Sequence, residues 1–281
     1  MRDDYVVVTS VNRNYLRIFD IWLHYFSRSE SSHTLKVITF DRKSDRYVSS
    51  LGIESVYVGS DVTDPREIFV NRLEVIASLL EAGSHVIHTD ADAIWVKPGI
   101  KALIDPAFDL QISIAYGIPK DVVKAWGFTL CCGFFVMHAT RAAISFHGNW
   151  SAESLKVKDD QIALNRLLLG SGVEWNSNNI NENQGFCAKH GLRIDAIRYD
   201  NVCRTHPEDP YVFHPYLPKR QQKLKVLDLI DRLRAFKPDP ILDDLRFRTI
   251  ADPLGWLSVP WDLLKMLAQE TWKSARRRLY S

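Results

Sequence analysis

Residues His85–Pro98 read HVIHTDADAIWVKP, and this stretch indicates both the fold and the candidate site. The β-branched residues of His85–Thr89 predict a short buried strand, and Gly83 ends the helix before it. Two carboxylates, Asp90 and Asp92, follow the strand with one residue between them. Buried carboxylates are costly unless a cation or donors meet them, and Mg²⁺ or Mn²⁺ favours such oxygen ligands. The alternative is an ordinary turn, in which Asp is common, but the apolar flanks favour a metal site.

Strands and helices alternate around this stretch. Helices are predicted from Asn14, over Ser44–Leu51 and from Asp64 to Gly83, where Asp64, Pro65 and Glu67 form a capping pattern. Strands are predicted at Tyr5–Val11, Leu35–Phe40, Ser55–Val58, Leu110–Tyr116 and within Trp126–Thr140. This alternation predicts an α/β fold, with a mostly parallel sheet covered by helices on both faces. In such a sheet the loops that follow the strands line the ligand crevice.

The strand followed by Asp-Ala-Asp and Ile-Trp resembles the DxD motif of GT-A-fold glycosyltransferases, most closely the nucleotide-diphospho-sugar transferase group of family 77. The resemblance covers roughly Tyr5 to Lys223. It implies a mixed, mostly parallel GT-A sheet flanked by helices in a domain over residues 1–236. A linker and a C-terminal amphipathic helical extension are expected over residues 237–281. It further implies that Asp90 and Asp92 hold Mn²⁺ or Mg²⁺ against the diphosphate of the donor, with Ala91 beside it.

The resemblance also assigns roles to residues near the first strands. Thr9, Ser10 and Asn12 follow the first strand and would face the nucleotide base; the alternative is that they cap the helix that begins near Asn14. Arg72 would contact the diphosphate or the sugar, unless it lies on a solvated helix face. Gly133 would lie next to the donor sugar, and its alternative is a bulge in a core strand.

A second informative patch is KDDQIALNRLLL, residues 158–169, in which Asp159 can cap a helix with Asp160 in its first turn. Capping is the simple interpretation of both acids. The resemblance places all three polar residues of the Asp159–Gln161 segment at the catalytic centre. Asp160 would orient sugar or acceptor hydroxyl groups, and Gln161 would lie near the anomeric carbon. Gln is a poor nucleophile, which favours front-face substitution; an inverting reaction would need Asp159 or Asp160 as base.

A third patch follows the predicted strand Tyr211–Phe213, which delivers His214. A lone His is more often structural, but an imidazole suits Mn²⁺ beside two carboxylates. The resemblance implies a late His as third metal ligand and a Lys a few residues on for the phosphates. His214 and Lys219 match that layout, with Lys223 as the alternative lysine and His206 as the rival ligand.

Composition excludes some classes of protein and of binding partner. With 281 residues, 46% hydrophobic, 25% charged and a net charge of +2, the chain is typical of globular proteins and is not expected to bind nucleic acid. The four cysteines lack zinc spacing and are expected to be reduced, which favours the cytoplasm. Residues 175–185 are expected to form a loop and residues 237–248 a linker. The helix predicted after Pro260, rich in Trp, Lys and Arg, is expected either to make peripheral membrane contact or to pack on the domain.

The expected function is therefore metal-dependent transfer of a sugar from a nucleotide-sugar donor, such as a UDP-sugar, to a hydroxyl group of a glycan or lipid-linked acceptor, with retention. One alternative is a nucleotidyltransferase or sugar pyrophosphorylase-like enzyme, although no Gly-rich phosphate loop follows the first strand. The other is a non-catalytic nucleotide-sugar-binding protein that acts at a membrane through its C-terminal helix.

Overall fold

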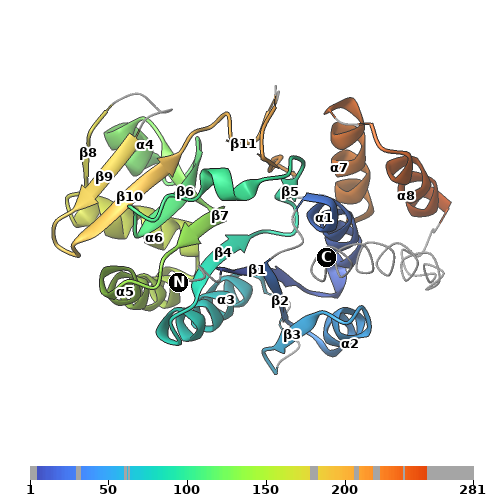
Figure 1. The fold of residues 1–281 in the computed structure, drawn as a ribbon, viewed down its shortest axis with the longest axis horizontal. Helices are drawn as coiled ribbons and strands as arrows, with labels where there is room; N and C mark the ends of the chain where they lie inside the picture. The colour runs from blue at the N-terminus through green and yellow to red at the C-terminus, as the bar shows by residue number, and fades with distance from the viewer. Residues whose placement is uncertain are drawn as a thin grey trace, which may run out of the picture.

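The computed structural model describes residues 5–29, 33–59, 62, 64–177, 183–205, 209–217, 222–236 and 238–251. These residues form a nine-stranded sheet with helices on both faces and a smaller three-stranded sheet beside it (Figure 1). The order of the large sheet is β3-β2-β1-β4-β7-β6-β10-β9-β8, and that of the small sheet is β11-β12-β5. The predicted mixed, largely parallel α/β fold is confirmed.

The first half of the large sheet is parallel. Its strands are β1 (Tyr5–Val11), β2 (Thr34–Thr39), β3 (Glu54–Tyr57) and β4 (His85–Thr89). The 3-10 helix η1 (Arg13–Tyr15) and the helices α1 (Leu16–Ser29), α2 (Arg42–Ser50) and α3 (Pro65–Glu81) connect them. Because β1 and β4 are parallel neighbours, the residues that follow them meet at one edge of the sheet.

The second half is mixed. Its strands are β6 (Leu110–Ala115), β7 (Thr129–Met137), β8 (Glu174–Trp175), β9 (Asn183–Cys187) and β10 (Leu192–Ile197). β7 runs antiparallel to both β4 and β6, whereas β6 and β10 are parallel. The helices α4 (Lys120–Trp126), α5 (Arg141–Val157) and α6 (Asp160–Gly170) complete this half. The loop expected over residues 175–185 is wrong at both ends, because Trp175 ends β8 and Asn183 begins β9, which pairs with β8 as a sheet edge.

Each face of the large sheet has its own core. Helices α1 and α7 (Gln222–Phe236) cover one face, where Trp22 and Trp95 are fully buried. Helices α3, α5 and α6 cover the other face around Phe135 and Trp150. The four cysteines are free and buried, as expected.

The small sheet positions the residue that follows β12. It consists of β5 (Ile94–Trp95), β11 (Val202–Cys203) and β12 (Val212–Phe213), with the 3-10 helix η2 (Ile100–Leu103) following β5. β12 pairs antiparallel with β5, so that Phe213 lies opposite Ile94. This pairing brings the residue after β12 beside the turn that precedes β5.

The expected linker over residues 237–248 is wrong. Helix α8 (Pro240–Ala251) fills most of this segment and packs on α7 beside α1 (Figure 1). Leu242 is fully buried, and Asp239 binds Arg28 at 2.5 Å and His24 at 3.2 Å. The proline suggested a linker, but proline is also favoured in a first helical turn. The helix predicted after Pro260 lies outside the described residues, and no described helix is long and apolar enough to cross a bilayer.

The docking of α8 is testable through Leu242. Leu242→Ala removes a side chain that is 0% exposed and should lower the free energy of unfolding by about 2–5 kcal/mol. Phe247→Ala is the matched control, because Phe247 lies on the same helix and is 71% exposed, and it should change stability little. Urea denaturation measures both variants; equal effects would contradict the packing described here.

A buried carboxylate in α1 makes stability depend on pH. Asp20 is 6% exposed and accepts a hydrogen bond from the Tyr47 hydroxyl. Burial raises the pKa of Asp20 from 3.8 to about 7, although the Tyr47 hydroxyl and Arg17 act to lower it. Between these two values the folded state binds more protons than the unfolded state, so stability falls as the pH rises.

Asp20→Asn should therefore flatten the stability profile between pH 4 and 7, where the wild type should lose about 3 kcal/mol. Urea denaturation at pH 4.5 and 7.5 measures the difference. Asp243→Asn, at a carboxylate whose side chain is 64% exposed, should retain the wild-type slope. The same slope in Asp20→Asn as in the wild type would exclude Asp20 as its origin.

Candidate metal centre

Asp90 and Asp92 lie in a tight turn at the carboxyl end of β4. The Ala93 N–H donates to the Asp90 carbonyl at 2.9 Å, and the Asp90 N–H donates to the Gly133 carbonyl of β7 at 2.7 Å. The Trp95 indole N–H donates to the Thr89 hydroxyl at 3.2 Å and ties the far end of the turn to the strand. The segment is thus an ordinary turn in its backbone, and it also presents two carboxylates on one side.

His214 reaches these carboxylates from the small sheet. Its N–H donates to the Cys203 carbonyl at 2.8 Å, which fixes the backbone where β12 ends. The imidazole Nε2 lies 3.5 Å from Asp92 Oδ1 and 4.0 Å from Asp90 Oδ2. One ligand atom from each of the three side chains lies within 4.8 Å of the others.

The three side chains fit a divalent cation. Ligands around an octahedral Mg²⁺ at about 2.1 Å are separated by about 3–4 Å, which is the spacing of His214 Nε2 from both carboxylates. Two carboxylates and an imidazole form a donor set suited to Mn²⁺ as well.

Gly133 makes room for this cluster. A Cβ atom at this position would lie 2.1 Å from His214 Cε1 and 2.9 Å from Asp90 Oδ2, distances that real contacts do not allow. The pairing of β6 with β7 shifts register between Ile112 and Ser113, beside this glycine. Both interpretations of the sequence thus describe the same feature, since an irregular core strand brings backbone close to the cluster.

Arg72 links the cluster to helix α6. Its Nη1 donates to Asp90 Oδ1 at 2.7 Å, and its Nε donates to Asp160 Oδ2 at 2.9 Å, with Nη2 on the same oxygen. Arg72 is 3% exposed, so the solvated-face alternative is wrong. Burial acts to lower the pKa of Arg72, but the charges of Asp160 and Asp90 outweigh it and raise that pKa.

The N-terminus of α6 holds its polar residues in distinct ways. Asp159 Oδ1 accepts from the Ile162 N–H at 2.8 Å, which is the capping predicted for it. Asp160 is buried, and burial raises the pKa of its carboxyl group although Arg72 acts to lower it. Gln161 donates from Nε2 to the Ile118 carbonyl at 3.1 Å. Of these three residues, Asp160 is the one that Arg72 connects to the cluster.

Sequence inspection missed two residues beside the cluster. Arg204 follows β11 and donates to Cys131 Sγ, which lies 4.0 Å from His214 Nδ1. Burial raises the pKa of Tyr15, and the nearby charges of Asp92 and Asp90 raise it further. The Tyr15 hydroxyl accepts a hydrogen bond from Lys225 Nζ at 3.2 Å. Neither residue stands in a recognisable motif, because only the fold brings them here.

The charges around His214 oppose one another. Burial acts to lower its pKa, but hydrogen bonding to Asp92 and to Cys131 outweighs burial and raises the pKa to about 10. Burial likewise acts to raise the pKa of Asp92, and the hydrogen bond to His214 brings it below its ordinary value. When no metal is bound, the protonated His214 ring therefore balances the negative charge of the carboxylates. Metal binding to this ring would require loss of its proton, and the metal would then supply the positive charge.

The remaining predicted residues are placed as follows. Thr9 is fully buried in β1, Ser10 is half-buried, and Asn12 caps η1 by accepting from the Asn14 N–H at 3.0 Å. Ala91 is buried between the two carboxylates. Lys219 and the rival ligand His206 lie outside the described residues, as does the side chain of Lys223.

Comparisons with known proteins concern the family and the fold of this chain. The family described as nucleotide-diphospho-sugar transferase matches residues 31–217. The uncharacterized protein At1g28695 of Arabidopsis thaliana is 25% identical over 157 residues, which are 55% of this chain and 41% of that protein. The chain thus spans about two fifths of the length of this relative.

Several solved structures resemble this chain at low sequence identity. The bifunctional glycosyltransferase WbbM has a TM-score of 0.51 at 11% identity, covering 89% of this chain and 52% of WbbM. The galactosyltransferase LgtC, solved with donor and acceptor sugar analogs, has a TM-score of 0.45 at 13% identity, covering 58% and 70%. Streptococcus pneumoniae GlyE has a TM-score of 0.42 at 12% identity, covering 59% and 44%.

The close packing at Gly133 gives a direct test of the cluster. Gly133→Ala should displace the His214 ring, lower stability by about 1–3 kcal/mol and weaken Mn²⁺ binding about tenfold or more. Calorimetric titration with Mn²⁺ and urea denaturation measure the two effects.

Gly148→Ala is the matched control, because a Cβ there, in helix α5, meets nothing within 4 Å. It should raise stability by about 1 kcal/mol and leave Mn²⁺ binding unchanged. Wild-type Mn²⁺ affinity in Gly133→Ala would show that His214 is not a ligand.

Proposed function

The chain belongs to the nucleotide-diphospho-sugar transferase family, and from this premise we propose that it transfers a sugar from a nucleoside-diphosphate sugar, preferably a UDP-sugar, to a hydroxyl group of a glycan or lipid-linked acceptor. The observation that carries the proposal is the convergence of Asp90, Asp92 and His214 from two separate segments of the chain. An ordinary turn would need neither a buried histidine beside it nor a glycine whose missing Cβ makes room for that histidine.

Asp90, Asp92 and His214 would hold Mn²⁺ or Mg²⁺, and the bound ion would neutralise charge on the leaving diphosphate. In the reaction an acceptor oxygen forms a bond to the anomeric carbon, and the bond from that carbon to the diphosphate breaks. The nucleoside diphosphate departs with the bonding electrons, and a phosphate oxygen of this leaving group accepts the proton of the acceptor hydroxyl.

The residues of the chain contribute orientation and charge. Arg72 donates hydrogen bonds to both Asp160 and Asp90, which fixes where Asp160 can receive sugar or acceptor hydroxyl groups. Arg204, with a pKa raised by Cys131 against the effect of burial, adds a permanent cation near the leaving group. Lys219, Ala91, Ser10 and Asn12 complete the proposed donor contacts, whereas Thr9 is 0% exposed and is not one of them.

Retention of the anomeric configuration is part of the proposal and rests on the likeness to family 77. Gln161 would lie near the anomeric carbon, where its amide is a poor nucleophile and front-face attack needs none. Asp159 serves as the helix cap and Asp160 as the partner of Arg72, so neither carboxylate is held in a way that favours an inverting base. Proton NMR of the first-formed product distinguishes the two stereochemical outcomes.

The proposal is tested by donor hydrolysis with UDP- and GDP-sugars in Mn²⁺ and then in EDTA. The wild type should release nucleotide from one donor only when metal is present. Asp92→Asn should lower kcat/KM at least about a hundredfold, because it removes a ligand of the ion that neutralises the leaving group.

Asp209→Asn is the control, at a carboxylate whose side chain is 74% exposed, and it should retain activity. Full activity of Asp92→Asn, or equal release with EDTA, would contradict metal-dependent transfer. Calorimetric binding of UDP with Mn²⁺, without release from any donor alone or with an acceptor, would instead favour a non-catalytic binding protein.

A further inference from the structure

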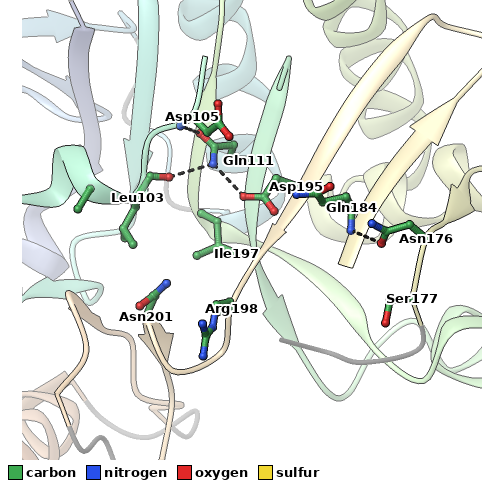
Figure 2. Close-up of a pocket in the computed structure, with 11 residues that line it drawn as sticks. Leu103, Asp105, Gln111, Asn176, Ser177, Gln184, Asp195, Ile197, Arg198 and Asn201 are labelled. Atoms are coloured by element: carbon green, nitrogen blue, oxygen red, sulfur yellow. Dashed lines mark hydrogen bonds between the residues drawn. The ribbon is translucent and has the colours of Figure 1, made fainter. Parts of the chain in front are cut away.

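A row of polar side chains crosses β6, β10 and β9 on the face of the sheet that lies away from α5 and α6. Gln111 of β6 pairs with Asp195 of β10, and Asp195 pairs in turn with Gln184 of β9. Because paired residues point to the same face, their side chains form one row, as Figure 2 shows. Ile112 and Ile194, which are next to Gln111 and Asp195 along their strands, face the core on the other side of the sheet.

The centre of the row is held rigidly. Gln111 is 1% exposed, and its Nε2 donates to the Leu103 carbonyl at 2.9 Å and to Asp195 Oδ2 at 2.8 Å. Its Oε1 accepts from the Asp105 N–H at 2.7 Å. These bonds use every strong polar direction of the buried amide except one lone pair, and they fix the orientation of the Asp195 carboxylate (Figure 2).

A cavity of about 630 Å³ lies over this row, within the size range of small-ligand sites. Most of the residues that line it carry amide, hydroxyl or charged side chains: Asp105, Gln111, Asn176, Ser177, Gln184, Asp195, Arg198 and Asn201. The remaining three are Ala102, Leu103 and Ile197.

This lining indicates a neutral, hydroxyl-rich ligand. The acids Asp105 and Asp195 would repel a phosphate, and among the described residues Arg198 is the one basic side chain that lines the cavity. A lipid tail would bury the amides without partners, which is costly. Hydroxyl groups both donate and accept, so a saccharide matches a wall of fixed carboxylate and amide groups.

The face of the sheet under the cavity continues toward the candidate metal centre. Ser113 and Ile197 form the next row, about 7 Å from Gln111 and Asp195 along the strands. The Ser113 hydroxyl donates to the Cys131 carbonyl at 3.1 Å, and Cys131 contacts His214.

The chain also connects the two sites directly. Asn201 lines the cavity, and its carbonyl accepts from the Tyr211 and Val212 N–H groups. This loop continues into β11, which delivers Arg204, while β12 delivers His214. The cavity and the candidate metal centre are therefore linked by one continuous segment of the chain.

We propose that this cavity, over the row from Gln111 to Gln184, binds a neutral oligosaccharide whose terminal sugar reaches the candidate metal centre as the acceptor. The proposal rests on the proposed glycosyl transfer for its role as acceptor site, but the binding of the saccharide stands by itself. It selects a glycan over a lipid as the group recognised next to the acceptor hydroxyl.

The experiment is direct binding of an array of neutral oligosaccharides, one to four sugars long, without nucleotide or metal. The wild type should bind at least one member, more tightly as the chain lengthens beyond one sugar. Asp195→Asn and Gln184→Ala should each weaken that binding about tenfold. Glu174→Ala, at an exposed position in the same β8–β9 hairpin, should bind like the wild type and retain its donor hydrolysis.

The outcomes separate this inference from the proposed reaction. Absence of binding to every neutral oligosaccharide, or binding unchanged in both cavity variants, would overturn the assignment even if the wild type hydrolyses a nucleotide sugar. Selective oligosaccharide binding supports the cavity as a glycan site, whether or not hydrolysis of a donor is found. Folding of each variant is checked by its unfolding transition in urea.

Discussion

The ion pairs of Arg72 hold the candidate site together. This buried guanidinium joins helix α3 to the end of β4 through Asp90 and to the start of α6 through Asp160. A buried cation without partners would be strongly unfavourable, so the three elements must meet where both carboxylates are present. The same contacts keep two acids close together in a region of low exposure, where they would otherwise repel one another.

The DxD turn and its strand could be predicted because the relevant physics is local. β4 begins and ends where alternation and β-branching predict, and the caps of α3 and α6 follow from short-range hydrogen bonds at Asp64 and Asp159. His214 was predicted as a candidate partner for the acids, although its neighbours come from distant sequence. The family resemblance supplied that pairing, whereas local pattern alone favoured a structural histidine.

What could not be predicted depends on tertiary contacts. Arg204 and Tyr15 approach the cluster only because β11 and η1 end beside it, and no spacing in the sequence records this. Helix α8 has almost no segregation of polar and apolar residues, so its burial through Leu242 carries no periodic signal. The polar row of the glycan cavity depends on strand register across three strands, which is set by the whole sheet.

The pairing of β5 with β12 has a consequence for the connectivity of the chain. Each strand has two residues, yet their pairing closes a very long loop between the DxD turn and His214. A ligand that bridges both ends would act as a reversible cross-link, comparable in topology to a disulfide. Since it binds only the closed state, it would add about 2.7 kcal/mol to the free energy of unfolding at a hundred times its Kd. Ligand binding at this site and resistance to unfolding would thereby be coupled in this protein.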